Sequence, residues 1–203
     1  MTLEQDMVKF VRSPRFPQTI IERSIPQNRI IIESVASIPR EPLDGDEIFY
    51  LADATNGVTW RFRYRAGSSS TYKWEFIGGP PLWELLATSE STTSTSYANL
   101  ATTGPDLTVP LAGDYDITIG ATISSTVAEI AIMSYAVGGA AAADSDSMRM
   151  GTGGGDQNSN TRTVRETGIA ASTAIVAKYK SFGGASVTFF DRWMSITPVR
   201  IGG

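Results

Sequence analysis

Aromatic and charged residues alternate along the stretch "TWRFRYR", in which Trp60, Phe62 and Tyr64 hold one set of positions and arginines hold the other. Because successive side chains of a strand point to opposite faces, this spacing predicts a strand with an aromatic face and a cationic face. A Gly/Ser turn follows, and "TYKWEF" then repeats the spacing. The aromatic residues expected to meet across the turn are Trp60, Phe62, Tyr64, Tyr72, Trp74 and Phe76.

The same pattern extends toward the N-terminus, where "DGDEIFYLAD" predicts a strand through Phe49 and Leu51. Asn56 and Gly57 then form a strong hairpin signal, because both tolerate the positive φ angles of a tight turn. Residues 44–79 are therefore expected to form a three-stranded antiparallel β-meander. A sheet of three strands needs a covering partner, and we expect the preceding arm or a neighbouring subunit to supply it.

The C-terminal half is a series of predicted strands with Gly-rich turns. "GDYDITIGATIS" alternates like a half-buried strand, whereas "AEIAIMSYAV" is apolar at both alternations and predicts a strand buried on both faces. In the last run, Val187 and Phe189 hold one alternation while Met194 and Ile196 hold the other. This change of phase predicts a β-bulge near Phe190–Arg192. The expected fold class is all-β, with a C-terminal β-sandwich or jelly roll.

The N-terminal part and the connector give weaker patterns. Residues 2–11 have the spacing of a short amphipathic helix, and the chain from Gln18 to Pro42 is expected to be extended. Exposure of Ile30, Ile31 and Ile32 to solvent would be unfavourable, so we expect an arm that docks on another chain or on the body. A disordered tail is the alternative. In the connector, leucines around Trp83 predict one or two helical turns.

The run from Gly138 to Asn160 is long and rich in small and polar residues, which predicts a surface loop. The sequence leaves open whether this loop is a binding tip or a tolerated insertion. The residues that a binding tip would use are Asp144, Asp146, Arg149, Asp156 and Asn158.

Composition removes most catalytic chemistries. The chain of 203 residues contains no His and no Cys, so it offers neither an imidazole nor a thiolate for catalysis or zinc binding. "GTGGGDQ" lacks the Lys-Ser/Thr of a P-loop, and "DSDS" and "DGDE" lack the ligand count of a calcium loop. Carboxylate pairs for glycoside cleavage occur in any acidic protein, and no spacing here is distinctive. We expect no enzymatic activity, no cofactor and no metal.

The net charge of −4 gives no general attraction to nucleic acid. Arg61, Arg63 and Arg65 are the best candidates for such contacts, but rings on the opposite face could not stack on bases while these arginines hold phosphates. We expect a solvated or subunit-contacting face, with intersubunit salt bridges as one form of it. No run is long enough to span a membrane, and the N-terminus lacks the apolar region of an export signal. We therefore expect synthesis in a cytosol without membrane insertion.

The run "DGDEIFYLADATNGVTWRFRYRAGSSSTYKWEFIGGPPL" resembles a module of structural proteins of tailed bacteriophages. "YANLATTGPDLTVPLAGDYDITIGA" and "FFDRWMSITPVRIGG" look like the jelly roll that accompanies it, so the resemblance spans about Pro42 to the C-terminus. It implies a non-enzymatic virion protein, often a homotrimer, anchored by its N-terminus with the jelly roll outward and assembled in the host bacterial cytoplasm. Minor tail, fibre and capsid-surface (decoration) proteins share these motifs, so the place in the virion stays open.

The expected organisation is an anchoring arm (1–42), a β-meander collar (43–79), a connector (80–97) and a jelly-roll domain (98–203). The arm would bind other virion proteins, with the isoleucines and arginines named above as assembly contacts. One alternative is an adhesin that holds a host-surface glycan with the Gly138–Asn160 loop, and an aromatic residue exposed beside that loop would favour it. A second alternative is a polysaccharide-degrading spike, which would show two facing carboxylates in a cleft.

Overall fold

The computed structural model describes residues 31–32 and 38–202 of the chain. The chain divides into two compact units, Met1–Ile31 and Ile32–Gly203, and the strands that follow β1 (Ile31–Ile32) belong to the second unit. The helix expected at residues 2–11 and the assembly residue Ile30 lie outside the described residues. The side chains of Ile31 and Ile32 lie outside them as well.

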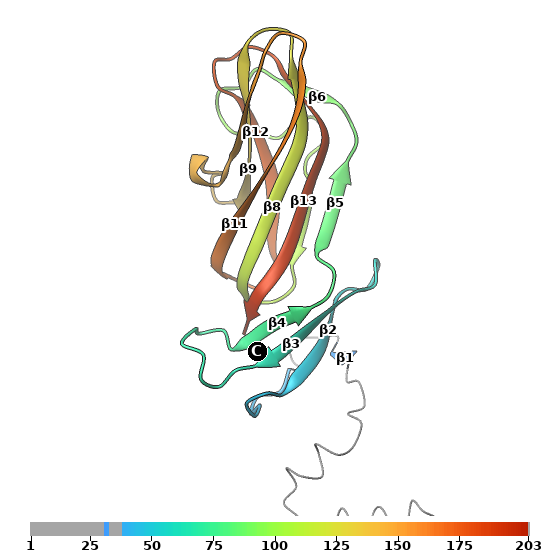
Figure 1. The fold of residues 1–203 in the computed structure, drawn as a ribbon, viewed down its shortest axis with the longest axis vertical. Coiled ribbons are helices and arrows are strands. Elements are labelled where there is room, and N and C mark those ends of the chain that lie inside the picture. The colour runs from blue at the N-terminus through green and yellow to red at the C-terminus, as the bar shows by residue number, and fades with distance from the viewer. Residues whose placement is uncertain (1–30, 33–37, 203) are drawn as a thin grey trace, which may run out of the picture. The chain divides into compact units, whose positions relative to one another are not determined.

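The described part is all-β, as expected, and two antiparallel sheets form a β-sandwich (Figure 1). In the larger sheet the strand order is β2-β3-β4-β13-β8-β11, and β5 and β6 also pair with β13. Its strands are β2 (Glu47–Asp53), β3 (Val58–Tyr64), β4 (Trp74–Gly78), β5 (Leu82–Leu86), β6 (Glu90–Thr92), β8 (Gly113–Ser125), β11 (Gln157–Ile169) and β13 (Val187–Ile201). The smaller sheet has the order β10-β9-β12-β7, with β7 (Asp106–Val109), β9 (Glu129–Val137), β10 (Met148–Thr152) and β12 (Thr173–Ser181).

The long strand β13 joins the meander to the sandwich (Figure 1). Along one side it pairs with β8, and along the other it pairs in succession with β6, β5 and β4. The last contact sets Ile201 opposite Trp74. The meander and the sandwich therefore share one hydrogen-bonded sheet.

The aromatic pairing predicted for the meander is confirmed. Phe62 lies opposite Phe76 and Tyr64 lies opposite Trp74, with ring centroids 5.9 and 5.3 Å apart. Tyr72 precedes β4 and takes no part in this register.

The cover of the meander's aromatic face comes from an element that the sequence analysis did not consider. Trp60 is fully buried and packs on Tyr115 of the sandwich at 6.3 Å between ring centroids. Ile38, which falls in the range expected for the arm, belongs to the same buried core. The collar is thus packed within its own chain through β8.

The two central strands of the sandwich behave as their patterns predict. Tyr115, Ile117 and Ile119 of β8 are fully buried and alternate with partly exposed polar residues. In β9, residues 131–136 are buried at both alternations because one face meets the core and the other is covered by the loop that follows β9. Both predictions are confirmed.

The predicted bulge in β13 is also confirmed. The pairing of β13 with β8 shifts between Phe190 and Trp193, and Asp191 takes a positive φ of 43°. The shift turns Arg192 inward, where it is fully buried beside Glu90 and Tyr179. A change of hydrophobic phase in the sequence therefore marks the place where a cation enters the core.

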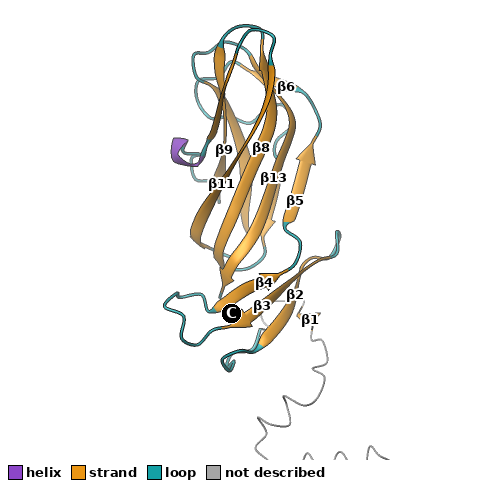
Figure 2. Cartoon of the chain, viewed as in Figure 1, coloured by secondary structure: helices purple, strands orange, loops and turns teal. Residues whose placement is uncertain are grey.

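Two local predictions are wrong. The connector holds strand β5 at Leu82–Leu86 and not helical turns, because β13 offers it an open edge for pairing (Figure 2). Leucines at 82, 85 and 86 fit a helical face, but in the strand Leu82 is buried and Leu86 half-buried, while Trp83 and Leu85 are exposed. The run from Gly138 to Asn160 is not one loop: it contains the 3₁₀ turn η2 (Asp144–Asp146), all of β10 and the start of β11.

Candidate functional site

A surface depression of about 620 Å³ lies where the connector, the loop after β9 and strand β12 come together. One wall is the small-residue run Gly139–Ala142, whose short side chains leave the backbone open to approach. The other lining residues are polar or aromatic, namely Thr95, Ser96, Tyr97, Asp144, Lys178 and Lys180. The depression is open to solvent and is not an enclosed cavity.

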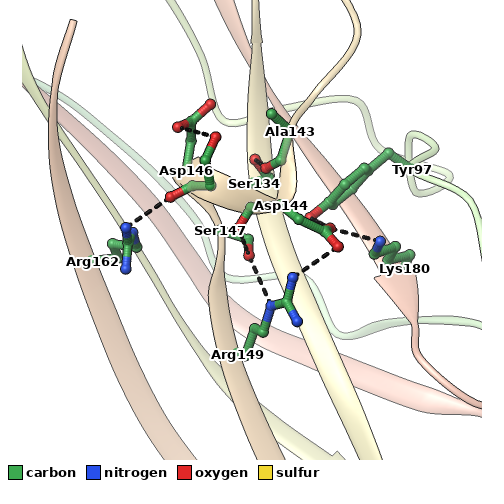
Figure 3. A network of polar contacts seen from close by, with 10 residues as sticks. Tyr97, Ser134, Ala143, Asp144, Asp146, Ser147, Arg149, Arg162 and Lys180 are labelled. Atoms are coloured by element: carbon green, nitrogen blue, oxygen red, sulfur yellow. Dashed lines mark hydrogen bonds and ion pairs between the residues drawn. The ribbon is translucent and has the colours of Figure 1, made fainter.

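Asp144 is the centre of the polar contacts at the depression (Figure 3). Its Oδ1 accepts hydrogen bonds from Lys180 Nζ and from the Tyr97 hydroxyl, both at 2.7 Å. Its Oδ2 lies 2.7 Å from Nη2 of Arg149. The hydrogen bonds from Lys180 and Tyr97 and the nearby cations lower the pKa of Asp144 from 3.8 to about 2. Asp144 is therefore a fixed anion at neutral pH.

Tyr97 is held between a cation and this anion. Lys180 Nζ lies 4.3 Å from the centroid of the Tyr97 ring, within the range of a cation–π contact. Burial and the hydrogen bond to Asp144 raise the pKa of Tyr97 to about 12, so the hydroxyl stays a donor. The ring is consequently fixed at the rim of the depression.

Hydrogen bonds from three strands hold the η2 turn in place. Ser134 of β9 donates to the Ala143 carbonyl at 2.8 Å, and Arg162 of β11 donates to the Ser145 carbonyl at 2.7 Å (Figure 3). Ser147 donates to the Asp144 carbonyl at 2.8 Å, and Arg149 of β10 donates to the Ser147 hydroxyl at 3.2 Å. The position of Asp144 is thus built into the sandwich.

The lysines come from alternate positions of β12. Lys178 and Lys180 share the outward face of the strand, while Ala177 and Tyr179 between and beside them are buried. Lys178 Nζ donates to Asn99 Oδ1 at 2.6 Å. Lys180 is mostly covered, with 15% of its side chain exposed.

The structure brings together two of the five loop residues named from the sequence, Asp144 and Arg149. Asp146 lies on η2 and accepts a hydrogen bond from Ser145, whereas Asp156 sits in the β10–β11 turn and Asn158 lies on β11 opposite Ile123. Tyr97, Lys178 and Lys180 also belong to the site, and the sequence alone did not mark them as site residues. The alternation in "AKYK" marks both lysines as outward, but nothing local indicates that they meet η2.

The arginine row faces away from the aromatic core, as predicted, and each of its arginines has an acidic partner within the chain. Arg63 donates to Glu47 Oε1 at 2.6 Å, and Arg61 donates to Glu47 Oε2 at 2.9 Å. Arg65 lies 3.4 Å from Glu75. Burial raises the pKa of Glu47, but the hydrogen bonds and charges of the two arginines outweigh it and lower that pKa. A role of the row in assembly stays a prediction.

An aromatic pair that the sequence analysis did not place lies on the outer face of the larger sheet. Trp83 of β5 is 52% exposed and stacks on Trp193 of β13, with centroids 4.8 Å apart and planes 22° apart. Trp193 in turn lies over Gly120 of β8, where a Cβ atom would overlap its indole. The missing side chain of Gly120 makes room for this stack.

Within residues 31–32 and 38–202, no group of three or more Asp or Glu residues is placed to hold a metal ion. The same part of the chain contains no helix with the length and apolarity needed to cross a membrane.

The fold and the site define an antiparallel β-sandwich with a charged depression at one sheet. No model of a protein family matches the sequence, and no curated protein matches it. Similar solved structures include TmCBM61 in complex with β-1,4-galactotriose, at 15% identity and a TM-score of 0.32 over 60% of this chain and 72% of that one. The C-terminal CBM6 of LamC from Zobellia galactanivorans is 19% identical, with a TM-score of 0.32 over 58% of this chain and 98% of that one.

A third similar structure is the carbohydrate-binding module CBM6cm-2 from Cellvibrio mixtus lichenase 5A in complex with cellotriose. It is 15% identical, with a TM-score of 0.29 over 78% of this chain and 100% of that one.

Proposed function

We propose that the chain is a non-enzymatic structural protein of a tailed-phage virion, anchored by its N-terminal arm with the β-sandwich on the particle surface. The resemblance of the meander motifs supports the class of protein. The observation that supports display of the β-sandwich on the particle surface is the pairing of β13 with both β8 and β4. Because one strand runs from the sandwich into the collar, the displayed domain is held by backbone hydrogen bonds to the collar motifs.

The chemistry of the depression supports the non-enzymatic part of this proposal. A general acid or base works best when its pKa lies near the working pH. Asp144 has its pKa lowered to about 2 and Tyr97 has its pKa raised to about 12, so both are far from that range. The sequence also offers no His and no Cys to take their place.

Antibody labelling of intact particles tests the display role. Antibodies raised against residues 98–203 are expected to decorate the surface of purified virions in electron micrographs. Particles that contain the chain but bind the antibody only after disruption would contradict surface display.

We further propose that the chain is a homotrimer in the particle. Light scattering that shows a stable monomer of the full chain would contradict this proposal.

A second candidate function is glycan binding by an adhesin at the depression. The observation that favours it is Tyr97, an aromatic residue at the rim beside the 139–142 loop. Aromatic rings and a few fixed polar groups in a concave site are typical of ligand-binding sites. Purified protein is expected to bind host cells and to lose binding in Tyr97→Ala, whereas equal binding by the variant would exclude this site.

A further inference from the structure

The depression carries excess positive charge on a protein that is acidic as a whole. Lys178 and Lys180 line it together with the carboxylate of Asp144, so the lining residues carry a net charge of +1 against −4 for the whole chain. Asp144 is shared by Arg149 and Lys180. Among the described residues, the nearest hydrogen-bond partner of Lys178 is the neutral amide of Asn99. Within the part of the chain that the structure describes, no ion pair balances the positive charge of Lys178.

The surroundings of Lys178 suit a small polyhydroxylated ligand. Thr95 and Ser96 bring hydroxyl groups to the depression, and the wall at Gly139–Ala142 carries no side chain larger than a methyl group. The depression has room for a short oligosaccharide, at about 620 Å³. An extended apolar surface, which a peptide anchor would require, is not among the lining residues.

We propose that the depression binds an acidic saccharide, with its carboxylate or phosphate at Lys178 and its sugar ring between Tyr97 and the small-residue wall. This inference rests on the glycan-binding candidate above and names its ligand class. Lys178 supplies the charge for the anion, while Lys180 stays engaged with Asp144 and the Tyr97 ring. Lys178 is partly exposed and its hydrogen-bond partner is a neutral amide, so its ammonium group can form a charge-assisted hydrogen bond with a ligand anion.

Calorimetric titration of the full chain tests this proposal with matched probes. Trigalacturonate is compared with its methyl ester to test a carboxylate, and 6-phosphomaltotriose is compared with maltotriose to test a phosphate. We expect one charged probe to bind at least about tenfold more tightly than its neutral partner, the usual scale for one charge-assisted hydrogen bond. The pair of probes that shows the difference identifies the anion. The affinity of the charged probe in that pair should fall as the salt concentration is raised.

Variants of Lys178 locate the contact. Lys178→Gln is expected to lose about tenfold in affinity for the charged probe, and Lys178→Arg is expected to keep most of it because the charge remains. Lys73→Gln is the matched control, since Lys73 is, like Lys178, a partly exposed lysine, and it lies in the meander turn and donates to the Ala66 carbonyl. Circular dichroism verifies that each variant is folded.

The failures of the two proposals are distinguishable. If the methyl ester and maltotriose both bind as tightly as their charged partners, the acidic class is wrong while glycan binding stands. If none of the four probes binds and host cells are not bound either, both proposals fall. An equal loss of affinity for the charged probe in Lys178→Gln and Lys73→Gln would show that the overall charge of the protein attracts the probe. That result would overturn the site at Lys178.

Discussion

Arg192 is the largest buried charge that the structure describes in the sandwich core, and its partners decide what its loss would cost. Nη1 lies 3.3 Å from Glu90 Oε2, and Nη2 donates to Thr88 Oγ1 at 2.7 Å, while Nε has no partner among the described residues. Removing one member of a buried ion pair typically costs about 3–5 kcal/mol, because the other charge stays behind. We expect Arg192→Met to destabilise the protein by about 3 kcal/mol in urea unfolding.

The double variant Arg192→Met/Glu90→Gln separates charge from packing. With Glu90 neutral, no uncompensated anion remains, so this variant should recover a good part of the lost stability. If both variants unfold at the same urea concentration, the loss comes from packing against Tyr179 and not from the stranded carboxylate.

The lowered pKa of Asp144 makes the stability of the folded protein depend on pH in the acidic range. Its pKa is about 2 in the folded protein against 3.8 ordinarily, so the folded state favours the ionised form. The resulting stability is fully present above pH 3.8 and is lost as the pH falls from 3.8 to about 2. The thermal midpoint of Asp144→Asn should therefore fall less steeply than that of the natural protein across this interval.

Other carboxylates with lowered pKa, such as Glu47 and Glu129, titrate in both proteins and form a common background. The difference between the two pH profiles thus reports Asp144 alone. Parallel profiles from pH 4 to about pH 2 would contradict the coupling of Asp144 to Lys180 and Tyr97.

At the scale of elements, the junction of β8 and β13 depends on a glycine. Gly120 lies opposite Trp193, and an added Cβ would overlap the indole that stacks on Trp83. We expect Gly120→Ala to destabilise the protein by about 1–3 kcal/mol, the usual cost of overpacking, and to change the near-ultraviolet circular dichroism of the tryptophans.

Gly151→Ala is the matched control for this substitution. Gly151 also lies in a strand, β10, but a Cβ there would have nothing within 4 Å. Adding Trp193→Ala to Gly120→Ala should remove the clash, so the two changes should be non-additive. Simple additivity would show that the backbone of β8, and not the indole, resists the larger residue.

The elements also show what alternation can and cannot predict. The period of two in β8 and the phase change at Phe190–Arg192 are local properties, so the sequence predicted both. Trp83 was misplaced because leucines at 82, 85 and 86 satisfy a helical face as well as a strand, and only the open edge of β13 decides between them. Patterns within short apolar runs do not resolve this choice.

The candidate site was less predictable than the fold, for a physical reason. Tyr97 and Lys180 are 47 and 36 residues away from Asp144 in the chain, and they reach it through the pairing of β12 with β9 and the bridge between Ala98 and Tyr179. No spacing in the sequence encodes such a contact. Asp144 and Arg149 were found because a polar run is visible locally, whereas their partners belong to strands and connectors with other apparent roles.

At the scale of the whole molecule, the compact unit Ile32–Gly203 defines how the anchoring arm should be tested. Ile38 is buried in the core of this unit, at 3% exposure, although it falls within the arm expected from the sequence. A truncation that removes residues 1–42 would therefore remove a core side chain as well as the arm. Burying an isoleucine contributes about 1.5–3 kcal/mol, so such a truncation mixes two effects.

Removal of residues 1–31 avoids this mixture. We expect the truncated chain to keep the thermal midpoint of the full chain, because the core residues are retained, and to be absent from purified particles, because the arm is proposed to anchor it. Ile38→Ala in the full chain is the opposite control, since it should lower stability by about 2–4 kcal/mol and still enter particles. Incorporation of the chain lacking residues 1–31 at the normal level, measured by quantitative immunoblotting of virions, would overturn the anchoring role and place attachment in the meander or the sandwich.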